Sequence, residues 1–248
     1  MTFTGAIVSR VRCVELRESV QSEDQMRILI ACETSGATRR AFANLGHDVT
    51  SVDVLPADDG VSGAVVYGKG RMRHAIGDVR PYLREPWDLV IAHPPCTYLT
   101  NSGVRWLYTG GKANADASNL DFERWDRMTD GVNLFTECYN ANAPRVAVEN
   151  PIMHGHARRY LTARAVPGPS CIVQPWQHGH GETKATGFWL RGLPCLEPTN
   201  VVGGRTAYCH RLPPTADRWK LRSKTYDGIA RAMAAQWGTA PRDLAEVS

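Results

Sequence analysis

Short apolar runs recur along the chain and alternate with segments of helical periodicity. The runs at 27–32 (RILIAC), 88–92 (DLVIA) and 145–148 (RVAV) are too short for helices and predict buried strands. The segment 47–54 (HDVTSVDV) predicts a further strand, which ends beside an acid. Four short strands spread along the first 150 residues leave room for a helix between them.

Two segments between these runs predict helices. The segment 38–45 (TRRAFANL) is followed by Gly46, a usual residue just after a helix. The segment 122–142 has apolar side chains at helical spacing, namely Phe122, Trp125, Met128, Val132, Phe135 and Tyr139. Strands that alternate with helices predict an α/β fold, a mostly parallel sheet flanked by helices, which binds ligands at the carboxyl ends of its strands.

The first residues differ in character from the rest of the chain. The stretch 17–25 (RESVQSEDQ) is polar and has no apolar period, so residues 1–25 are expected to form a poorly ordered lead. A single domain is expected over 26–248, because 248 residues suit one α/β domain with a modest appendage. There is no apolar run of membrane-helix length and no signal-peptide pattern, so we expect a cytoplasmic protein without a membrane partner.

Charge and cysteine content narrow the picture only slightly. The net charge of +4 is compatible with a polyanionic partner but does not by itself indicate one. The seven cysteines are odd in number and scattered, which argues against a disulfide framework and fits a reducing compartment. Composition therefore leaves the function open, and the residues at the predicted strand ends carry more information about it.

Small or acidic residues come after the first two strands. The turn 33–38 (ETSGAT) leads into a helix, and its backbone can approach a ligand closely, although an ordinary tight turn has the same composition. Asp53 ends the next strand, where dinucleotide-type folds bind ribose hydroxyls, and a solvated turn aspartate is equally compatible. Asp78 is expected at a further strand end, where its carboxylate can accept a hydrogen bond from an amine.

A cysteine and a glutamate come after the two remaining strands. Pro94 and Pro95 hold the backbone extended and direct Cys96 outward, which favours a nucleophile over a buried structural cysteine. Glu149 and Asn150 come after the last predicted strand, where a carboxylate is costly without a partner or a function. Cys96 and Glu149 are therefore expected at neighbouring strand ends, facing one pocket.

These motifs resemble those of the cytosine-C5 DNA methyltransferase family, especially its short phage-type members. The segment 93–96 (HPPC) is similar to the family's Pro-Cys nucleophile motif, and 148–151 (VENP) is similar to its Glu-Asn-Val motif. The remaining motifs are matched in the family's order by 32–36 (CETSG), Asp53, Asp78 and 222–230 (RSKTYDGIA).

The resemblance implies a Rossmann-like fold, S-adenosylmethionine as cofactor and methylation of carbon 5 of cytosine in DNA. Cys96 would attack C6 of the ring, Glu149 would act at N3 and Asn150 would orient the strand end. The target base would be flipped out or single-stranded. A monomer in a bacterial or phage-infected cell is expected, with the cofactor held by Glu33, Ser35, Gly36, Asp53, Asp78 and Pro94.

The chain departs from the family pattern in three places. The cofactor turn lacks a clear glycine pair, and Lys184 stands in the region where the family has the arginine that supports the cytosine. Only 192–221 remains for target recognition, which predicts a hairpin-like excursion and lax sequence selectivity. The segment 102–119 is rich in Gly, Ala and Asn and predicts a mobile loop over the bound nucleotide, with Arg105 and Lys112 near phosphate.

Other functions fit parts of the pattern. A zinc site of Cys195, Cys209 and nearby histidines is not expected, because the spacing matches no standard finger. An amino-methyltransferase would carry an aromatic residue after Pro-Pro, where this chain has Cys96. Methylation of RNA or a nucleotide, and a catalytically silent DNA-binding homologue, both stay open.

Overall fold

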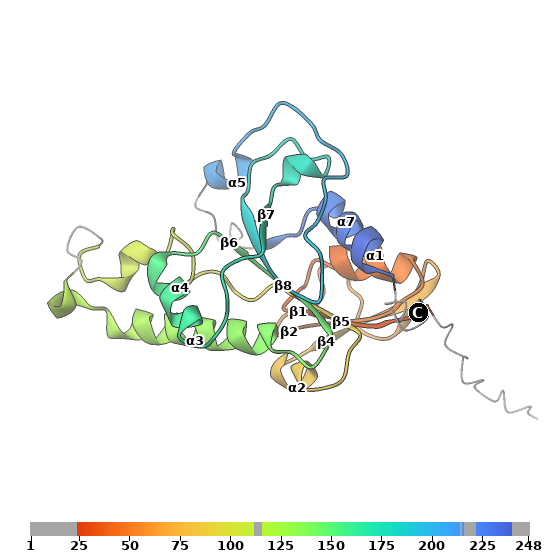
Figure 1. Ribbon diagram of the computed structural model, residues 1–248, viewed down its shortest axis with the longest axis horizontal. Coiled ribbons are helices and arrows are strands. Elements are labelled where there is room, and N and C mark those ends of the chain that lie inside the picture. Colours follow the sequence, from red (N-terminus) through yellow and green to blue (C-terminus); the bar gives the residue numbers. More distant parts are fainter. Residues whose placement is uncertain (1–23, 112–115, 214, 216–221, 240–248) are drawn as a thin grey trace, which may run out of the picture.

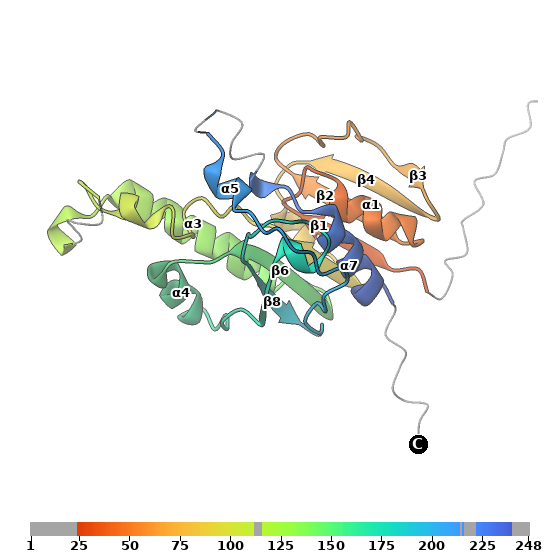
Figure 2. The same ribbon diagram turned by 90° about the horizontal axis from the view of Figure 1, so that it is seen from above.

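The computed structural model describes residues 24–111, 116–213, 215 and 222–239, and within them the strands form one eight-stranded sheet with helices on both faces (Figures 1 and 2). The strands are β1 Arg27–Ala31, β2 Asp48–Asp53, β3 Val65–Tyr67, β4 Gly70–Ile76, β5 Leu89–Ala92, β6 Arg145–Pro151, β7 Cys171–Val173 and β8 Thr186–Arg191. The helices are α1 Ala37–Asn44, α2 Arg80–Leu83, α3 Phe122–Tyr139, α4 Gly155–Thr162, α5 Tyr208–Arg211 and α7 Asp227–Trp237, with 3₁₀ turns η1 Val104–Leu107, η3 Ala117–Asn119 and η4 Pro175–Gln177.

The strand order is β3-β4-β2-β1-β5-β6-β8-β7. Strands β4, β2, β1, β5 and β6 are parallel, whereas β8 runs antiparallel to both of its neighbours and β3 runs antiparallel to β4. The chain moves outward from β1 in one direction to β2 and β4, and in the other to β5 and β6. This mixed sheet is the expected Rossmann-like fold, and its topological switch point lies between β1 and β5, where such sheets bind ligands.

Each central strand contributes to two cores, because successive side chains point to opposite faces of the sheet. On one face, Leu29 and Val90 pack with the α3 residues Met128, Val132 and Phe135. On the other face, strand residues that alternate with these pack against α1 and α7, with Ile28, Ile30, Leu89, Ile91, Phe42, Met233 and Trp237 all buried. The central strands are therefore buried on both sides, which explains their continuous apolar runs.

The last predicted strand is longer than its apolar run. Strand β6 continues through Glu149 and Asn150 because β8 pairs with it, placing Glu149 opposite Phe188 and Asn150 opposite Gly187. Glu149 and Asn150 thus lie within the strand and not after it, which corrects the expectation from sequence. The pairing of its backbone with β8 extends the strand into polar residues.

One other expectation needs correction. The described part of the segment 192–221, residues 192–213, is not a hairpin but runs alongside 178–182, with isolated bridges from His178 to Asn200 and from Glu182 to Thr206. The described part of the segment 102–119, which is predicted to be a mobile loop, packs against α3. Leu107 is buried there, and the indole of Trp125 donates a hydrogen bond to the Leu107 carbonyl. Lys112 lies outside the described residues.

Figure 1 shows the first turns of α3 projecting beyond the sheet together with α4 and η1. The predicted apolar stripe is buried at Met128, Val132 and Phe135, but Phe122 is 72% exposed because it lies on the projecting part. Among the described helices, none combines the length and the apolar character that crossing a membrane requires.

Candidate active site

Three strand ends meet beside the switch point. Ala92 at the end of β5 lies opposite Ala31 of β1 on one side and Val148 of β6 on the other. The residues directly after these positions therefore come to the same edge of the sheet. They are Cys32 and Glu33, then the 93–96 segment, and then Glu149 and Asn150.

His93 and Glu149 form a pair at this edge. The Nδ1 atom of His93 lies 2.6 Å from Oε2 of Glu149, and the two side chains are only 9% and 14% exposed. Burial alone would lower the pKa of His93, but the hydrogen bond and charge of Glu149, together with the charge of Glu33, outweigh burial and raise it. Burial alone would raise the pKa of Glu149, but the hydrogen bond and charge of His93 and the charge of Lys184 lower it. Both shifts favour the form of the pair in which His93 is an imidazolium and Glu149 a carboxylate.

Cys96 lies beside this pair and is partly exposed. Burial raises the pKa of its thiol, and the negative charge of Glu149 raises it further, whereas the positive charges of Lys184 and Arg222 lower it. A thiol in this setting is protonated at rest, and the two cations stabilise the thiolate once it forms. Lys184 is fixed in position because its Nζ donates a hydrogen bond of 2.7 Å to the Arg222 carbonyl.

Asn150 connects β6 to the loop that carries Cys96. Its Nδ2 donates a hydrogen bond of 3.1 Å to the carbonyl of Pro94, and the side chain is buried. The ring of Pro94 fixes its φ, and this hydrogen bond fixes its carbonyl, so the backbone just before Cys96 is held in place. The arrangement fits the orienting role that the resemblance implies for Asn150.

The turn after β1 is organised around Glu33. Its Oε1 accepts a hydrogen bond of 2.6 Å from the Ser35 hydroxyl, and that hydroxyl accepts one from the Ala37 N–H at the start of α1. Among the described residues, Oε2 of Glu33 is buried without a hydrogen-bond partner. A buried carboxylate oxygen without a partner is costly, so this atom is a candidate for contact with a bound ligand.

Gly36 occupies a crowded position with a left-handed backbone conformation, which no sequence pattern indicated. It adopts φ +69°, and an added Cβ would lie 2.4 Å from the Asp59 carboxylate, which forms ion pairs with Arg39 and Arg40. The close approach at Gly36 is therefore made by the chain's own charged side chains. The glycine is required by this contact whether or not a ligand is bound.

The two predicted aspartates stand at strand ends as expected, with different surroundings. Asp53 ends β2, accepts a hydrogen bond from the Leu55 N–H, and has a pKa that burial raises. Asp78 comes after β4, is exposed, and lies 3.4 Å from the guanidinium of Arg80. Asp53 is thus available to a ligand, whereas the carboxylate of Asp78 already has a partner.

A cavity of 430 Å³ opens next to the turn after β1, within the usual range for small-molecule sites of about 300–1,000 Å³. Ser35 and Arg40 line one side, and Tyr208 and the segment 224–227 line the other. Of the six residues predicted to hold the cofactor, only Ser35 lines this cavity. The remaining five, Glu33, Gly36, Asp53, Asp78 and Pro94, lie outside its lining.

A buried network that no sequence pattern indicated joins three segments beside this cavity. The Tyr226 hydroxyl donates a hydrogen bond to Oε2 of Glu182, and the Cys209 N–H donates one of 2.6 Å to Oε1. Glu182 thus connects the segment 192–213 to the segment that precedes α7. The Lys184 ammonium lies 5.6 Å from the ring centroid of Tyr226, so the network also supports the lysine.

The contact between α7 and this network leaves no room for a side chain at Gly228. A Cβ there would lie 1.8 Å from the His178 carbonyl oxygen. We expect Gly228→Ala to lower the free energy of unfolding by about 3 kcal/mol, measured by urea denaturation, because backbone must move to admit the methyl group. Gly168→Ala is the control, since a Cβ there meets open space, and an equal loss in both variants would contradict the packing described here.

Known proteins resemble the chain only distantly. The chain matches no known protein-family model and no curated protein sequence. One similar structure is described as a DNA modification methyltransferase encoded within a prophage of E. coli, with TM-score 0.42 and 13% identity over 77% of this chain and 56% of the other. A TehB-like SAM-dependent methyltransferase from Corynebacterium glutamicum aligns with TM-score 0.31 and 13% identity over 60% of this chain and 67% of the other. The chain thus spans little more than half of the first structure.

Proposed function

We propose that the protein transfers a methyl group from S-adenosylmethionine to carbon 5 of cytosine in DNA, through a covalent bond between Cys96 and C6. The observation that carries the proposal is the meeting of Cys96, the His93–Glu149 pair and Lys184 at the switch point of the sheet. A nucleophile, an acid–base pair and a fixed cation at the ligand-binding edge are the parts that this reaction needs.

The first step activates the ring. The Cys96 thiol gives its proton to water and its sulfur adds to C6, while Glu149 passes a proton to N3, where the displaced electron pair arrives. The proton comes from the His93–Glu149 pair, whose Nδ1 and Oε2 atoms are 2.6 Å apart. Lys184 stabilises the thiolate before attack and stands where the family has an arginine.

The addition turns C5 into the nucleophilic carbon of an enamine. S-adenosylmethionine, when bound, supplies the methyl group that C5 takes up. A base then removes the C5 proton, the C6–S bond breaks, and the electron pair returns to the Cys96 sulfur. The proton on N3 returns to the His93–Glu149 pair and the Cys96 thiolate takes up a proton again, so each methyl transfer releases one proton in total, the one from C5.

Two features of the turn after β1 suit the binding of a cofactor. Glu33 presents a buried carboxylate oxygen without a partner among the described residues, and the adjoining cavity has the volume of a small-molecule site. We propose that Glu33, Ser35 and Asp53 bind the cofactor directly. Pro94 and Gly36 would shape the site, and Asp78 would have to exchange its contact with Arg80 to take part.

The substrate cytosine must be outside a base stack for Cys96 to reach C6. We propose that 192–221 is a reduced recognition excursion of a single domain spanning 26–248. Its described part is held to the body by Glu182, and its secondary structure there is the four-residue helix α5. Sequence selectivity is then expected to be short or lax, and methylation by the isolated protein confined to a site of five or more base pairs would contradict this.

The product identifies the reaction. The protein is incubated with S-adenosylmethionine and DNA, the DNA is digested to nucleosides, and mass spectrometry with chromatographic standards separates 5-methylcytosine from N4-methylcytosine and N6-methyladenine. We expect 5-methylcytosine alone. Parallel reactions with RNA and with free nucleotides test the two substrate alternatives, and product only in those arms would overturn the choice of DNA.

Removal of the imidazole charge is expected to change how stability depends on pH. The lowered pKa of Glu149 contributes stability that is lost as pH falls through its folded value. The raised pKa of His93 contributes stability that is lost as pH rises through its folded value. The pair therefore stabilises the fold most between the unfolded values of about 4.3 and 6.5.

His93→Gln keeps a side chain that hydrogen-bonds but removes this charge. We expect it to destabilise the protein most within that window and progressively less above it, measured by urea unfolding across a pH series. His74→Gln, which alters a buried histidine of β4 outside the site, is the control. A loss of stability for His93→Gln that is the same at every pH would show that the pair is not charged.

A further inference from the structure

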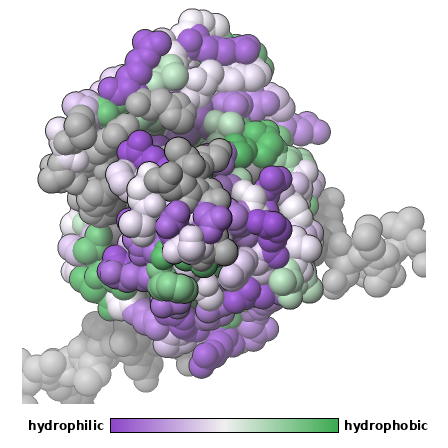
Figure 3. Space-filling model, turned by 90° about the vertical axis from the view of Figure 1, so that its left-hand side faces the viewer, coloured by the Kyte–Doolittle hydropathy of each residue, from purple (hydrophilic) through white to green (hydrophobic). Residues whose placement is uncertain are grey.

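A second cavity, of 510 Å³, lies on the projecting end of the molecule, away from the turn after β1. Its walls come from the residues just after η1, from the first turns of α3 and from α4. Aromatic side chains dominate the lining, which includes Tyr108, Phe122, Trp125, His156 and Tyr160. Figure 3 views the molecule from this end and shows patches of apolar surface among hydrophilic residues.

The aromatic rings of this cavity pack against one another over only part of their surface. Trp125 packs edge-on against His156, with centroids 5.0 Å apart at 71°, and against Tyr108 at 86°. Phe122 is 72% exposed and Tyr160 is 36% exposed, so both can receive a further flat group. A core cluster would have buried these two rings, whereas a stacking site leaves them open.

His156 adds no charge to the cavity. Its Nδ1 accepts a hydrogen bond of 2.8 Å from the Arg159 guanidinium, and its Nε2 lies 3.2 Å from the Tyr108 hydroxyl. Burial lowers the pKa of His156, and the charge of Arg159 lowers it further. The histidine is therefore a neutral part of the wall, and Arg159 is held at the rim by it.

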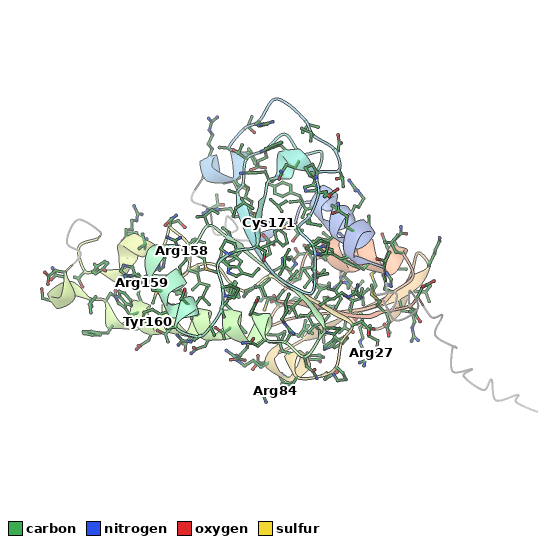
Figure 4. The ribbon with its side chains drawn as sticks, viewed as in Figure 1. Arg27, Arg84, Arg158, Arg159, Tyr160 and Cys171 are labelled. Carbon is green, nitrogen blue, oxygen red and sulfur yellow. The ribbon has the colours of Figure 1, made fainter. Side chains whose placement is uncertain are left out.

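Arginines lie in and beside the lining. Arg159 lines the cavity, Arg158 precedes it on α4, and Arg105 lies on η1 three residues before Tyr108. All three are exposed and, within the ranges that the structure describes, form no ion pair. Figure 4 shows Arg158, Arg159 and Tyr160 together on α4. Asp116 is the acid that lines the cavity, and its carboxylate accepts hydrogen bonds from Ser118. Flat aromatic walls with arginines outside them suit a base inside and its phosphates at the rim.

The cavity is connected to the nucleophile by main-chain contacts. His154, at the start of α4, donates its backbone N–H to the Leu99 carbonyl at 3.0 Å, and its Nε2 hydrogen-bonds the Tyr98 carbonyl at 2.9 Å. Thr100 bridges to Met153 beside them. The segment directly after Cys96 is thus fixed to the helix that carries Arg159 and Tyr160. A strand with its cytosine at Cys96 can extend along this segment toward the cavity.

We propose that this aromatic cavity binds an unpaired base of the DNA strand, a short distance from the target cytosine, while Arg158 and Arg159 bind the adjoining phosphates. The inference rests on the proposed function, because it takes single-stranded or locally opened DNA as the substrate. It gives a protein with a reduced recognition segment a second point of attachment to the strand.

The test measures binding of a fluorescent single-stranded oligodeoxynucleotide that contains one cytosine, by anisotropy, and methyl transfer to the same strand. A series of strands carries one abasic site at successive positions around the cytosine, which removes a base and keeps its phosphate. For the wild-type protein we expect one position to weaken binding roughly tenfold. Tyr160→Ala should weaken binding of the intact strand about as much and abolish the effect of that abasic site, with KM raised and kcat kept.

Two exposed residues outside the cavity supply matched controls. Tyr67 on β3 is 38% exposed, close to Tyr160 in its exposed fraction, and Tyr67→Ala is the control for Tyr160→Ala. Arg84 is an exposed arginine near α2, labelled in Figure 4, and Arg84→Gln is the control for Arg159→Gln. Tyr67→Ala and Arg84→Gln should bind as the wild type does. If Tyr160→Ala binds normally and keeps the abasic effect while the wild type methylates DNA, the inference is overturned and the proposed function stands. If the wild type neither binds nor methylates the strand, both fail.

Discussion

Cys96→Ala is expected to abolish methyl transfer, lowering kcat by about 10⁴-fold or more, which is the scale on which enzymes lose activity with their nucleophile. The reason is chemical, because cytosine C5 becomes nucleophilic only after a sulfur has added to C6. Cys32 comes after β1 at the same edge of the sheet and Cys209 lies near Lys184, so the variant also shows whether either of these thiols can replace Cys96. Single-turnover transfer of a tritiated methyl group to DNA measures the effect.

The loss has to be separated from unfolding and from loss of binding. Cys195 is exposed, and its Sγ donates a weak hydrogen bond to the Ser170 carbonyl, so Cys195→Ser is the matched control and should keep full activity. Cofactor and DNA affinities of Cys96→Ala should stay within a few-fold of the wild type. Methyl transfer by Cys96→Ala at more than a few per cent of the wild-type rate would rule out covalent catalysis through this residue.

Glu149→Gln is expected to lower kcat by about 10²–10⁴-fold, the usual contribution of a positioned acid or base. The amide can still accept the hydrogen bond from His93, so the geometry of the strand end is kept. It can neither carry the negative charge nor pass on a proton when charge develops at N3. The two buried groups then lose their mutual attraction, and the pKa of His93 should fall, because the charge of Glu149 helps to raise it.

The matched control is Glu85→Gln, just after α2. Glu85 is exposed and comes before β5, whereas the site lies after the end of that strand. Glu85→Gln should leave kcat unchanged. If Glu149→Gln retained most of its activity while Cys96→Ala lost it, the site would have a nucleophile without the proposed acid, and N3 would have to be stabilised by Lys184 instead.

Much of the sheet can be predicted from sequence patterns because its central strands are buried on both faces. The runs at 27–32 and 88–92 became β1 and β5, and the rule that parallel strands end at one edge brought Cys96 and Glu149 together. Strands β3, β7 and β8 were missed. All three run antiparallel to their neighbours, and β3 and β7 have only three residues each, so pairing with adjacent strands stabilises them more than their own composition does.

The side-chain partners within the site were less predictable. His93 stands directly before the two prolines, and a titratable residue at a buried strand end could have drawn attention to it. Its contact with Glu149 depends on the register of β5 with β6, which no local pattern encodes. The same holds for Glu182 and Tyr226, which lie 44 residues apart and meet only because the segment before α7 returns to the sheet.

The covalent step is the central claim, and DNA in which 5-fluorocytosine replaces cytosine tests it most directly. Fluorine at C5 cannot leave as a proton, so an enzyme that attacks C6 and methylates C5 stays bonded to the strand. With tritiated S-adenosylmethionine, we predict a labelled protein–DNA band on a denaturing gel that is present with the wild type and Cys195→Ser and absent with Cys96→Ala. Absence of such a band with the wild type, under conditions where cofactor and DNA are shown to bind, would contradict the account.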